Sequence, residues 1–338
     1  NASRLELNGE PVPIGSASMA ESDYEATWIA TASGNGRLAS LQSRPRRTEL
    51  EWVDRAGRSL GPLQLPAGWW EDLALSPDGE SVLAIRPIGM LETELWLFDS
   101  GGTRAERISS PGERINGGAV WAPDGRSFLY ASFSSGPCEI YRQDVGRARA
   151  PRIVPTVEAQ FKTVESVTPD GTALLVGVLD PIRRWSLWLA PLNGSGPAVL
   201  LSSTGRPPRA AVSPDGRRLA YTSLEQGRLE IYMTSLPGAS QRTRISTSGG
   251  RIPAWSLRGR ELLSISPAGR DSTIRSVLIG TGTVPLAGPP RPLLTRPGIV
   301  SYAATPDGER LLLSVESGDA PPPHIGLILN WTAGLENR

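Results

Sequence analysis

The sequence predicts an all-β fold, a single β-propeller of four-stranded antiparallel blades, and three observations favour it. A Ser-Pro-Asp-Gly-like motif recurs along the 338 residues, the residues before its glycines are 43 to 49 positions apart, and no segment has a sustained apolar stripe of helical period. A repeat of this length is typical of one propeller blade per copy. The copies begin at Ser76, Ala122, Thr168, Ser213 and Thr305, and degenerate copies begin at Ser33 and Ser256.

The motif is predicted to be the turn between the first and second strands of each blade. In the copy at Ser76, apolar residues come before the motif and the run Ser81–Ile85 follows it. Proline fixes φ near about −65°, aspartate accepts local backbone hydrogen bonds, and glycine supplies the positive φ that closes the hairpin. We therefore interpret the recurring aspartates as turn formers, not as catalytic or calcium-binding groups, because a ring places one in each blade. They are Asp78, Asp124, Asp170, Asp215 and Asp307.

A third strand of alternating character follows each turn, and a short fourth strand follows a glycine-rich connection. Examples of the third strand are Glu94–Phe98, Glu139–Arg142, Ser186–Ala190 and Glu230–Met233, and examples of the fourth are Arg107–Ile108 and Thr243–Ile245. Period-two alternation with aromatic and β-branched residues predicts half-buried strands. The tryptophans inside the strand patterns are expected in the core: Trp52, Trp96, Trp188 and Trp255.

The ends of the sequence suggest how the ring closes. The last unit has a candidate third strand at His324–Asn330 but little room for a fourth, whereas Arg4–Ile14 reads as the tail of a blade without inner strands. Pairing these two remnants would complete one blade and remove two exposed edges. Counted in this way, residues 1–338 form one domain of seven blades. Six blades is the alternative if the first copy or the degenerate copy near Arg258 is not a full blade.

Composition excludes several classes of function. The formal net charge is +1, from 35 basic and 34 acidic residues, which gives no electrostatic case for a nucleic-acid or membrane-surface partner. Lys162 is the only lysine, and the scattered arginines favour codon usage over a phosphate site as the reason. Cys138 is the only cysteine, so neither an internal disulfide nor a cysteine-based metal cluster is expected. No apolar run is long enough to cross a bilayer, and a targeting segment would lie outside a chain that begins at Asn1.

No pattern for catalysis is present in the sequence. His324 is the only histidine, and it follows three prolines at the start of a predicted strand. There is no Gly-x-Ser-x-Gly motif to hold a nucleophile, and neither Gly34–Gly36 nor Gly280–Gly282 has the strand-turn-helix setting of a dinucleotide site. We therefore expect a protein that is not an enzyme and that holds no cofactor and no metal.

Several stretches resemble the TolB-like propeller repeats of bacterial receptor-like serine/threonine protein kinases. They are the Ser-Pro-Asp-Gly repeats, Leu229–Ser240, Arg4–Val12, Leu50–Gly57 and the ending Asn330–Leu335. The resemblance covers essentially the whole chain, and it implies a WD-like sensor domain on the periplasmic, extracytoplasmic side of a membrane-anchored protein. It places the kinase domain and the membrane helix in segments outside this sequence. The kinase motifs themselves are missing here, so the resemblance implies no phosphoryl transfer.

Binding is expected on the loops that join blades and that join second to third strands. These loops converge around the central channel, and function concentrates on loops held by a rigid scaffold. Trp69 and Trp70 are adjacent and point opposite ways on an extended chain, so one of them is a candidate for an interface or both pack between blades. Arg46, Arg47, Arg183 and Arg184 form a possible basic rim for a carboxylate or phosphate, or they are solvated loop charges. The full set of candidate ligand-binding or partner-binding residues is Arg46, Arg47, Trp69, Trp70, Arg114, Arg183, Arg184, Arg209 and Arg251.

Three functional interpretations remain open from the sequence. The first is a non-catalytic sensor propeller of a receptor-like kinase, which binds an unidentified small ligand or protein partner. The alternative is a free-standing periplasmic TolB-like scaffold for protein–protein interaction. The third is a propeller detached from a prolyl-peptidase-type hydrolase, which the Asn330–Leu335 ending disfavours.

Overall fold

The computed structural model describes residues 20–22, 25–27, 30–32, 37–42, 47–88, 92–134, 136–147, 150–194, 196–236, 238, 241–268, 271–280, 287–317 and 324–329. The contacts within the chain divide it into two compact units, residues 1–46 with 318–338 and residues 47–317. The expectation of one domain over residues 1–338 therefore stays a prediction. No helix among the described residues is long and apolar enough to span a membrane.

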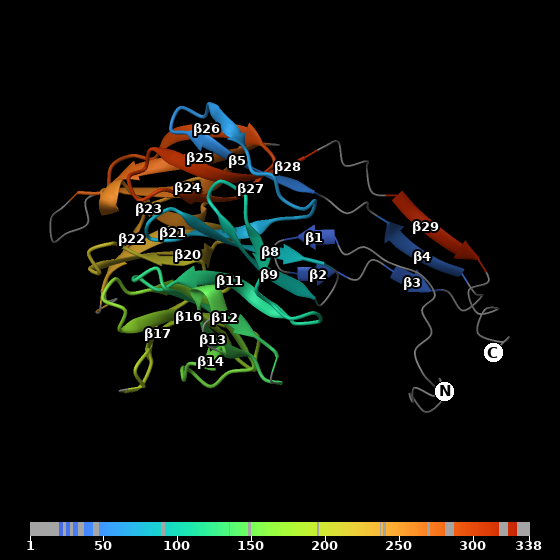
Figure 1. The fold of residues 1–338 in the computed structure, drawn as a ribbon, viewed down its shortest axis with the longest axis horizontal. Coiled ribbons are helices and arrows are strands. Elements are labelled where there is room, and N and C mark those ends of the chain that lie inside the picture. The colour runs from blue at the N-terminus through green and yellow to red at the C-terminus, as the bar shows by residue number, and fades with distance from the viewer. Residues whose placement is uncertain are drawn as a thin grey trace. The chain divides into compact units, whose positions relative to one another are not determined.

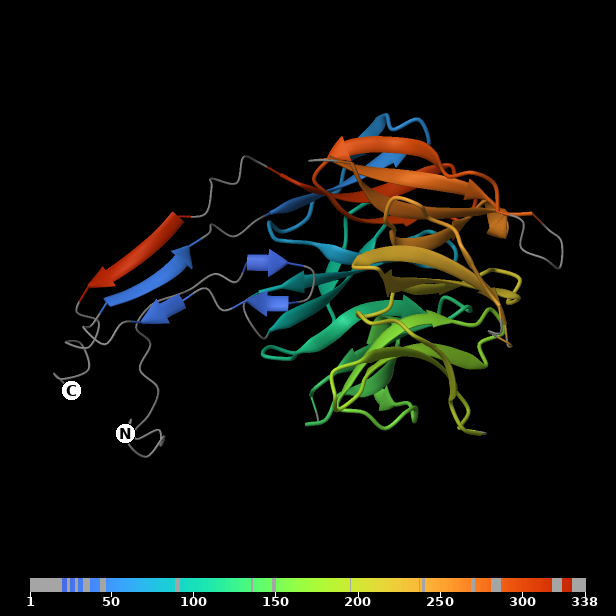
Figure 2. The ribbon, with the colours of Figure 1, turned by 180° about the vertical axis from the view of Figure 1, so that it is seen from behind.

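Residues 47–317 form a ring of six four-stranded antiparallel sheets, and five of these blades use consecutive strands (Figures 1 and 2). Blade 1 consists of β7 (Glu71–Leu75), β8 (Ser81–Pro87), β9 (Thr93–Asp99) and β10 (Ala105–Arg107), and blade 2 of β11 (Ile115–Trp121), β12 (Ser127–Ser132), β13 (Glu139–Asp144) and β14 (Arg152–Ile153). Blade 3 consists of β15 (Phe161–Val167), β16 (Ala173–Leu179), β17 (Trp185–Pro191) and β18 (Val199–Ser203), and blade 4 of β19 (Ala210–Val212), β20 (Arg218–Glu225), β21 (Arg228–Ser235) and β22 (Arg242–Arg244). Blade 5 consists of β23 (Arg251–Ser256), β24 (Glu261–Ala268), β25 (Asp271–Leu278) and β26 (Arg291–Pro297). The predicted four-stranded antiparallel blades are confirmed.

The sixth blade, here called the seam blade, combines strands from both ends of this unit. Its inner strands are β27 (Ile299–Ala304) and β28 (Arg310–Glu316), and its outer strands are β5 (Thr48–Asp54) and β6 (Ser59–Pro62). Strand β5, blue in Figure 1, pairs along its whole length with the orange-red β28. The innermost strand of each blade contacts that of the next, and β27 contacts β7, so the ring is closed.

The prediction of seven blades is wrong, and strand pairing gives the reason. The first motif copy lies between β3 (Ala30–Ala32) and β4 (Arg37–Gln42), which join β29 (His324–Leu329) in a separate three-stranded sheet of the smaller unit. Strand β29 was the predicted third strand of the last blade, but β5 takes that place. The predicted partner strand Arg4–Ile14 and the first copy at 33–36 lie outside the described residues. The smaller unit also contains the pair β1 (Ala20–Ser22) and β2 (Glu25–Thr27).

The second strand of each blade is almost continuously buried because both of its faces are covered by neighbouring blades. In β12 all six residues are buried, and in β16 five consecutive residues from Leu174 to Val178 are buried. A strand that is covered on both faces has no regular alternation of buried and exposed residues, whereas a strand with one face in water does. The core therefore lies between blades, as a set of clusters around the ring.

The turns between first and second strands gather at one end of the strands, which we call the turn face. In the turn Ser213–Arg217 the N–H of Gly216 donates to the carbonyl of Ser213 at 2.8 Å, and Gly216 has φ +71°. The hydroxyl of Ser213 donates to Asp215 at 2.5 Å and accepts from the N–H of Arg218 at 2.9 Å. Neighbouring turns touch, because a Cβ on Gly216 would lie 3.8 Å from Pro169 of the preceding blade.

The degenerate copy in blade 5 forms a full blade with a different turn. Without the Pro-Asp pair, Leu257 and Arg258 both adopt positive φ, +47° and +55°. The chain still joins β23 to β24, so the glycine at 259 with φ +86° preserves the hairpin although the proline is missing. The opposite end of the strands carries the connections between blades and between second and third strands, and we call it the loop face.

Candidate functional site

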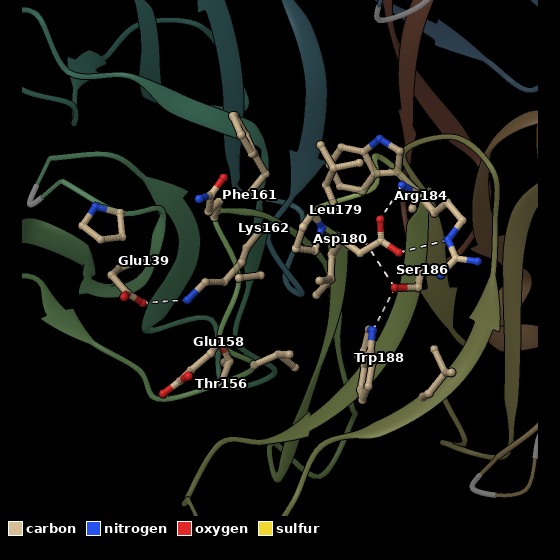
Figure 3. Close-up of a pocket in the computed structure, with 18 of the residues that line it drawn as sticks. Glu139, Thr156, Glu158, Phe161, Lys162, Leu179, Asp180, Arg184, Ser186 and Trp188 are labelled. Carbon is tan, nitrogen blue, oxygen red and sulfur yellow. Dashed lines mark hydrogen bonds and ion pairs between the residues drawn. The ribbon is translucent and has the colours of Figure 1, made fainter.

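A cavity of about 1210 Å³ crosses blade 3 on the side that faces blade 2, and we call it the blade 3 groove (Figure 3). It is lined by residues of all four strands of blade 3, from Phe161 and Lys162 on β15 to Leu200 on β18. Blade 2 contributes Glu139 and Ile153. The groove therefore runs from the innermost strand to the outer edge of the ring.

The groove is open because blade 2 has a very short outermost strand. Strand β14 consists only of Arg152 and Ile153, and residues 154–160 then return toward the ring centre without regular structure. Several of these returning residues, Thr156 and Glu158 among them, line the groove (Figure 3). On the facing wall Trp188 is left partly exposed, and its indole N–H donates to the hydroxyl of Ser186 at 2.9 Å.

At the inner end of the groove lies the only lysine of the chain. Lys162 is 3% exposed, and its Nζ donates to Oε2 of Glu139 at 2.8 Å (Figure 3). A buried ammonium group requires such a partner, because an unpaired charge in an apolar interior is costly. This end of the groove is therefore neutral, and the ion pair also ties blade 3 to blade 2.

At the loop face the groove is bordered by the connection from β16 to β17. Oδ1 of Asp180 accepts the N–H groups of Ile182 at 3.0 Å and Arg184 at 2.7 Å, and Arg184 Nε lies 3.1 Å from Oδ2. These bonds, first of all the backbone bond from Arg184, lower the pKa of Asp180 despite some desolvation. Arg183 adopts φ +61°, and Ile182 is 68% exposed. The loop is thus a tight turn that presents an arginine pair and an isoleucine.

The structure brings two of the nine predicted binding residues into the groove, Arg183 and Arg184. Arg114 lies beside it, with its guanidinium 4.7 Å from the ring centre of Phe133 and 5.9 Å from that of Phe161. Elsewhere, Arg47 is exposed and Arg251 is partly buried, while Arg46 lies outside the described residues. The binding role of these residues stays a prediction.

Of the two adjacent tryptophans, one is part of the core. Trp70 is 1% exposed, donates to the carbonyl of Pro66 at 3.1 Å, and meets Trp96 and Phe98 edge to face. It is therefore not available to a partner in this conformation, which corrects its place among the surface candidates. Trp69 is partly buried, and its indole N–H donates to Glu71 at 3.0 Å.

A second charged cluster lies where inner strands of several blades converge. Arg209, just before β19, forms an ion pair with Asp72 of β7, and a Cβ on Gly118 of β11 would lie 3.3 Å from Asp72. Glu165 of β15 accepts the hydroxyl of Thr163 at 2.6 Å. Burial raises the pKa of the Glu165 carboxyl to about 8, although Arg209 and Thr163 oppose the shift. This shift favours the protonated form of the Glu165 carboxyl near neutral pH.

Sequence reasoning missed most of the residues that form these two sites. The sequence shows that Lys162 is the only lysine, but codon usage explains that fact without predicting the ion pair with Glu139. Trp188, which is expected in the core, does pack against the core cluster between blades 2 and 3, but it also lines the groove. Glu165 and Leu200 carry no local signal, because their surroundings arise from packing between strands. Among the described residues no group of three or more histidine, cysteine, aspartate or glutamate side chains is placed to hold a metal ion.

Comparisons with known proteins agree with this fold. The TolB beta propeller domain family matches residues 67–256, more than half of the chain. Tol-Pal system protein TolB of Thioalkalivibrio sulfidiphilus is 40% identical over 68 residues, which are 20% of this chain and 15% of that protein. Tricorn protease homolog 1 of Streptomyces coelicolor is 32% identical over 137 residues, 39% of this chain and 12% of that protein. The matches therefore span only a small part of these curated relatives.

Among solved structures, the putative TolB of Agrobacterium tumefaciens is similar with a TM-score of 0.63 and 19% identity. The likeness covers 82% of this chain and 100% of that one. At this level of identity it is a likeness of fold.

Proposed function

Because this chain belongs to the TolB beta propeller domain family, we propose that it is a non-catalytic propeller that binds a protein partner at its loop face. The observation that carries the proposal is the blade 3 groove, which opens at the loop face beside Arg183 and Arg184. A rigid ring that presents irregular loops around a cavity is the usual arrangement of a binding scaffold.

The size and surroundings of the groove favour a protein over a small molecule. Its volume of about 1210 Å³ exceeds the roughly 300–1,000 Å³ of most small-molecule pockets. Exposed aliphatic side chains cluster around it, with Ile153 at 52%, Ile182 at 68% and Leu200 at 51% exposure. Apolar side chains gathered at a surface and bordered by arginine are typical of protein interfaces.

We further propose that the chain acts outside the cytoplasm, on the periplasmic side. The support is its similarity to a Tol-Pal system protein. A second candidate is the sensor domain of a membrane-anchored receptor-like serine/threonine kinase, and it rests on the resemblance of the ending Asn330–Leu335. Both candidates use the same binding face. The gene upstream of Asn1 separates them: a kinase domain and one membrane helix support the sensor, whereas a signal peptide alone supports the free-standing scaffold.

Site-specific photo-cross-linking in the native host tests the binding face. A photoreactive amino acid replaces Ile182 on the loop face or, as the matched control, the exposed Glu309 on the turn face. We expect a discrete protein adduct from position 182 and none from position 309. Equal labelling from both positions, or no adduct from position 182, contradicts a partner at the loop face.

A further inference from the structure

The outermost strand of blade 3 differs in composition from that of every other blade. Strand β18 reads Val-Leu-Leu-Ser-Ser, without a charged residue or a proline. Each other outermost strand has one or the other: Pro62 in β6, Glu106 in β10, Arg152 in β14, Arg242 in β22 and Arg291 in β26. Charges and prolines at sheet edges prevent another chain from pairing there. Blade 3 alone lacks a charge or a proline in its outermost strand, although β18 has a bulge at Leu201 in its pairing with β17.

The edge of β18 is also accessible. The strand is the last of its sheet, and within the described part of the chain it pairs only with β17. Val199 and Leu200 are 52% and 51% exposed. Apart from the carbonyl of Ser203, which accepts the Ser202 hydroxyl at 3.3 Å, the outer row of backbone groups of β18 can pair with an added strand. Many proteins capture extended peptides in this way.

The groove lies directly beside this edge. Leu200 pairs across the sheet with Trp188, so both side chains are on the same face, and both line the groove. Side chains alternate between the two faces of a sheet. A strand added next to β18 would thus direct every second side chain toward the groove, where Trp188, Leu200 and Ile153 offer an apolar surface.

The direction of β18 places a basic region at one end of the edge. Ser203 pairs with Ser186, and the N–H of Thr204 donates to the carbonyl of Trp185 at 2.9 Å, so the strand ends at the loop that carries Arg183. Among the described residues Arg183 forms no ion pair, whereas Arg184 is paired with Asp180. Glu158 lies on the other side of the groove from Arg184 (Figure 3). An acidic residue of a bound segment is therefore favoured at the loop-face end.

We propose that β18 and the blade 3 groove bind an extended segment of a partner protein as a fifth strand of blade 3. The segment has an uncharged run of about five residues, the usual length of a strand, with aliphatic side chains at alternate positions. An aspartate or glutamate lies at the end of the run that is near Arg183. The inference rests on the proposed function and specifies which part of the loop face and of its adjoining edge holds the partner.

The test selects octapeptides from a random display library on the whole chain. We expect the selected peptides to contain the uncharged aliphatic run with an acidic residue at one end. Leu200→Lys, which gives β18 the edge charge of the other blades, should weaken the binding of a selected peptide by at least about tenfold. Thr243→Lys on β22 adds the same charge to the exposed edge of blade 4 and should leave the affinity unchanged.

Two further measurements distinguish strand addition from simple apolar contact. N-methylation of one of the two alternate sets of peptide nitrogens should abolish binding and methylation of the other set should not, because only one set faces β18. Amide hydrogen exchange of residues 199–203 should slow when the unmodified peptide is bound. The proposal is overturned if no peptide is enriched, if Leu200→Lys and Thr243→Lys weaken binding equally, or if both methylated peptides bind as well as the parent.

Failure of this inference is distinguishable from failure of the proposed function. If position 182 cross-links to a protein in cells and Leu200→Lys leaves the adduct unchanged, the loop face binds a partner but β18 does not hold it. If position 182 gives no adduct, the proposed function itself fails. Unchanged melting temperature of Leu200→Lys ensures that a loss of binding does not reflect unfolding.

Discussion

The turn face and the inner strands of the ring use carboxylates in opposite ways. On the turn face, Asp78 accepts the hydroxyl of Ser76 at 2.5 Å and the N–H of Glu80 at 3.0 Å, and these bonds lower its pKa. On the inner strand β15, burial raises the pKa of Glu165 to about 8. The first arrangement repeats around the ring and stabilises turns, whereas the second occurs where several blades meet. A carboxylate that recurs in every turn therefore has a structural role, whereas a carboxylate at a position that does not repeat, such as Glu165, can have a strongly shifted pKa.

The largest expected effect on the free energy of unfolding comes from Glu165 on the inner strand β15. Below pH 4.5 both the folded and unfolded chains hold the Glu165 proton, and between pH 4.5 and about 8 only the fold retains it. Stability from Glu165 is thus fully present below pH 4.5 and is lost as the pH rises through about 8. Glu165→Gln should raise the free energy of unfolding at pH 9 by on the order of 3 kcal/mol and leave it unchanged at pH 4.

Urea denaturation across this pH range measures the effect, and the exposed Glu158→Gln is the matched control. A pH profile that is the same in Glu165→Gln and in the unmodified chain would show that the carboxyl is ionised in the fold.

A smaller effect is expected from the glycine of the repeated turn. Gly216 has φ +71°, which a β-branched side chain adopts only with strain. Gly216→Val should lower the free energy of unfolding by about 2 kcal/mol, whereas Gly216→Asn should cost less because asparagine tolerates this conformation. Thermal unfolding of the two variants checks the order. If both substitutions lowered the free energy of unfolding equally, the lack of room for a side chain, and not the backbone conformation, would explain why glycine is required at 216.

The turn carboxylates are expected to show the opposite pH dependence at smaller amplitude. Asp78→Asn should lower the free energy of unfolding at pH 7 by about 0.5 kcal/mol, because the carboxylate is exposed and solvent screens its hydrogen bonds. The pKa of Asp78 is lowered in the fold, so its contribution is present above the usual value of 3.8 and is lost as the pH falls through the folded value. Acid denaturation of both chains should therefore converge at low pH, and a constant difference down to pH 2 would argue against this origin.

The smallest effect is expected at the mouth of the groove. The ion pair between Arg184 and Asp180 is exposed, with 73% of the Arg184 side chain accessible. Arg184→Ala should leave the melting temperature unchanged, because exposed pairs contribute little. Differential scanning calorimetry checks this expectation. A clear decrease in the melting temperature would show that Arg184 stabilises the fold, which would weaken the contrast between the turn face and the loop face.

The sequence was sufficient for the repeated parts of the fold and insufficient for their assembly. The turn at Ser213–Arg217 follows from local chemistry, since proline, aspartate and glycine each favour one backbone conformation. The number of blades does not follow from local chemistry. The residues of Thr48–Asp54 do not themselves determine whether this strand pairs with β28 or with the strands that flank Ser33. The surroundings of Lys162 and Glu165 depend on the same long-range pairing. Arg183 and Arg184 were placed at the loop face from their position between predicted strands, but the groove beside them depends on the shortness of β14.

The seam blade has a consequence for how the chain acquires its structure. Strand β28 pairs with β5 but is synthesised about 250 residues after it. During synthesis one edge of β5 therefore has no strand to pair with until β28 is made, and unpaired backbone edges can associate with other chains. Closure also joins residues that are far apart in the sequence, which slows folding. Pairing of β5 with β28 therefore closes the ring late, and a chain in which this pair has not yet formed is exposed to aggregation.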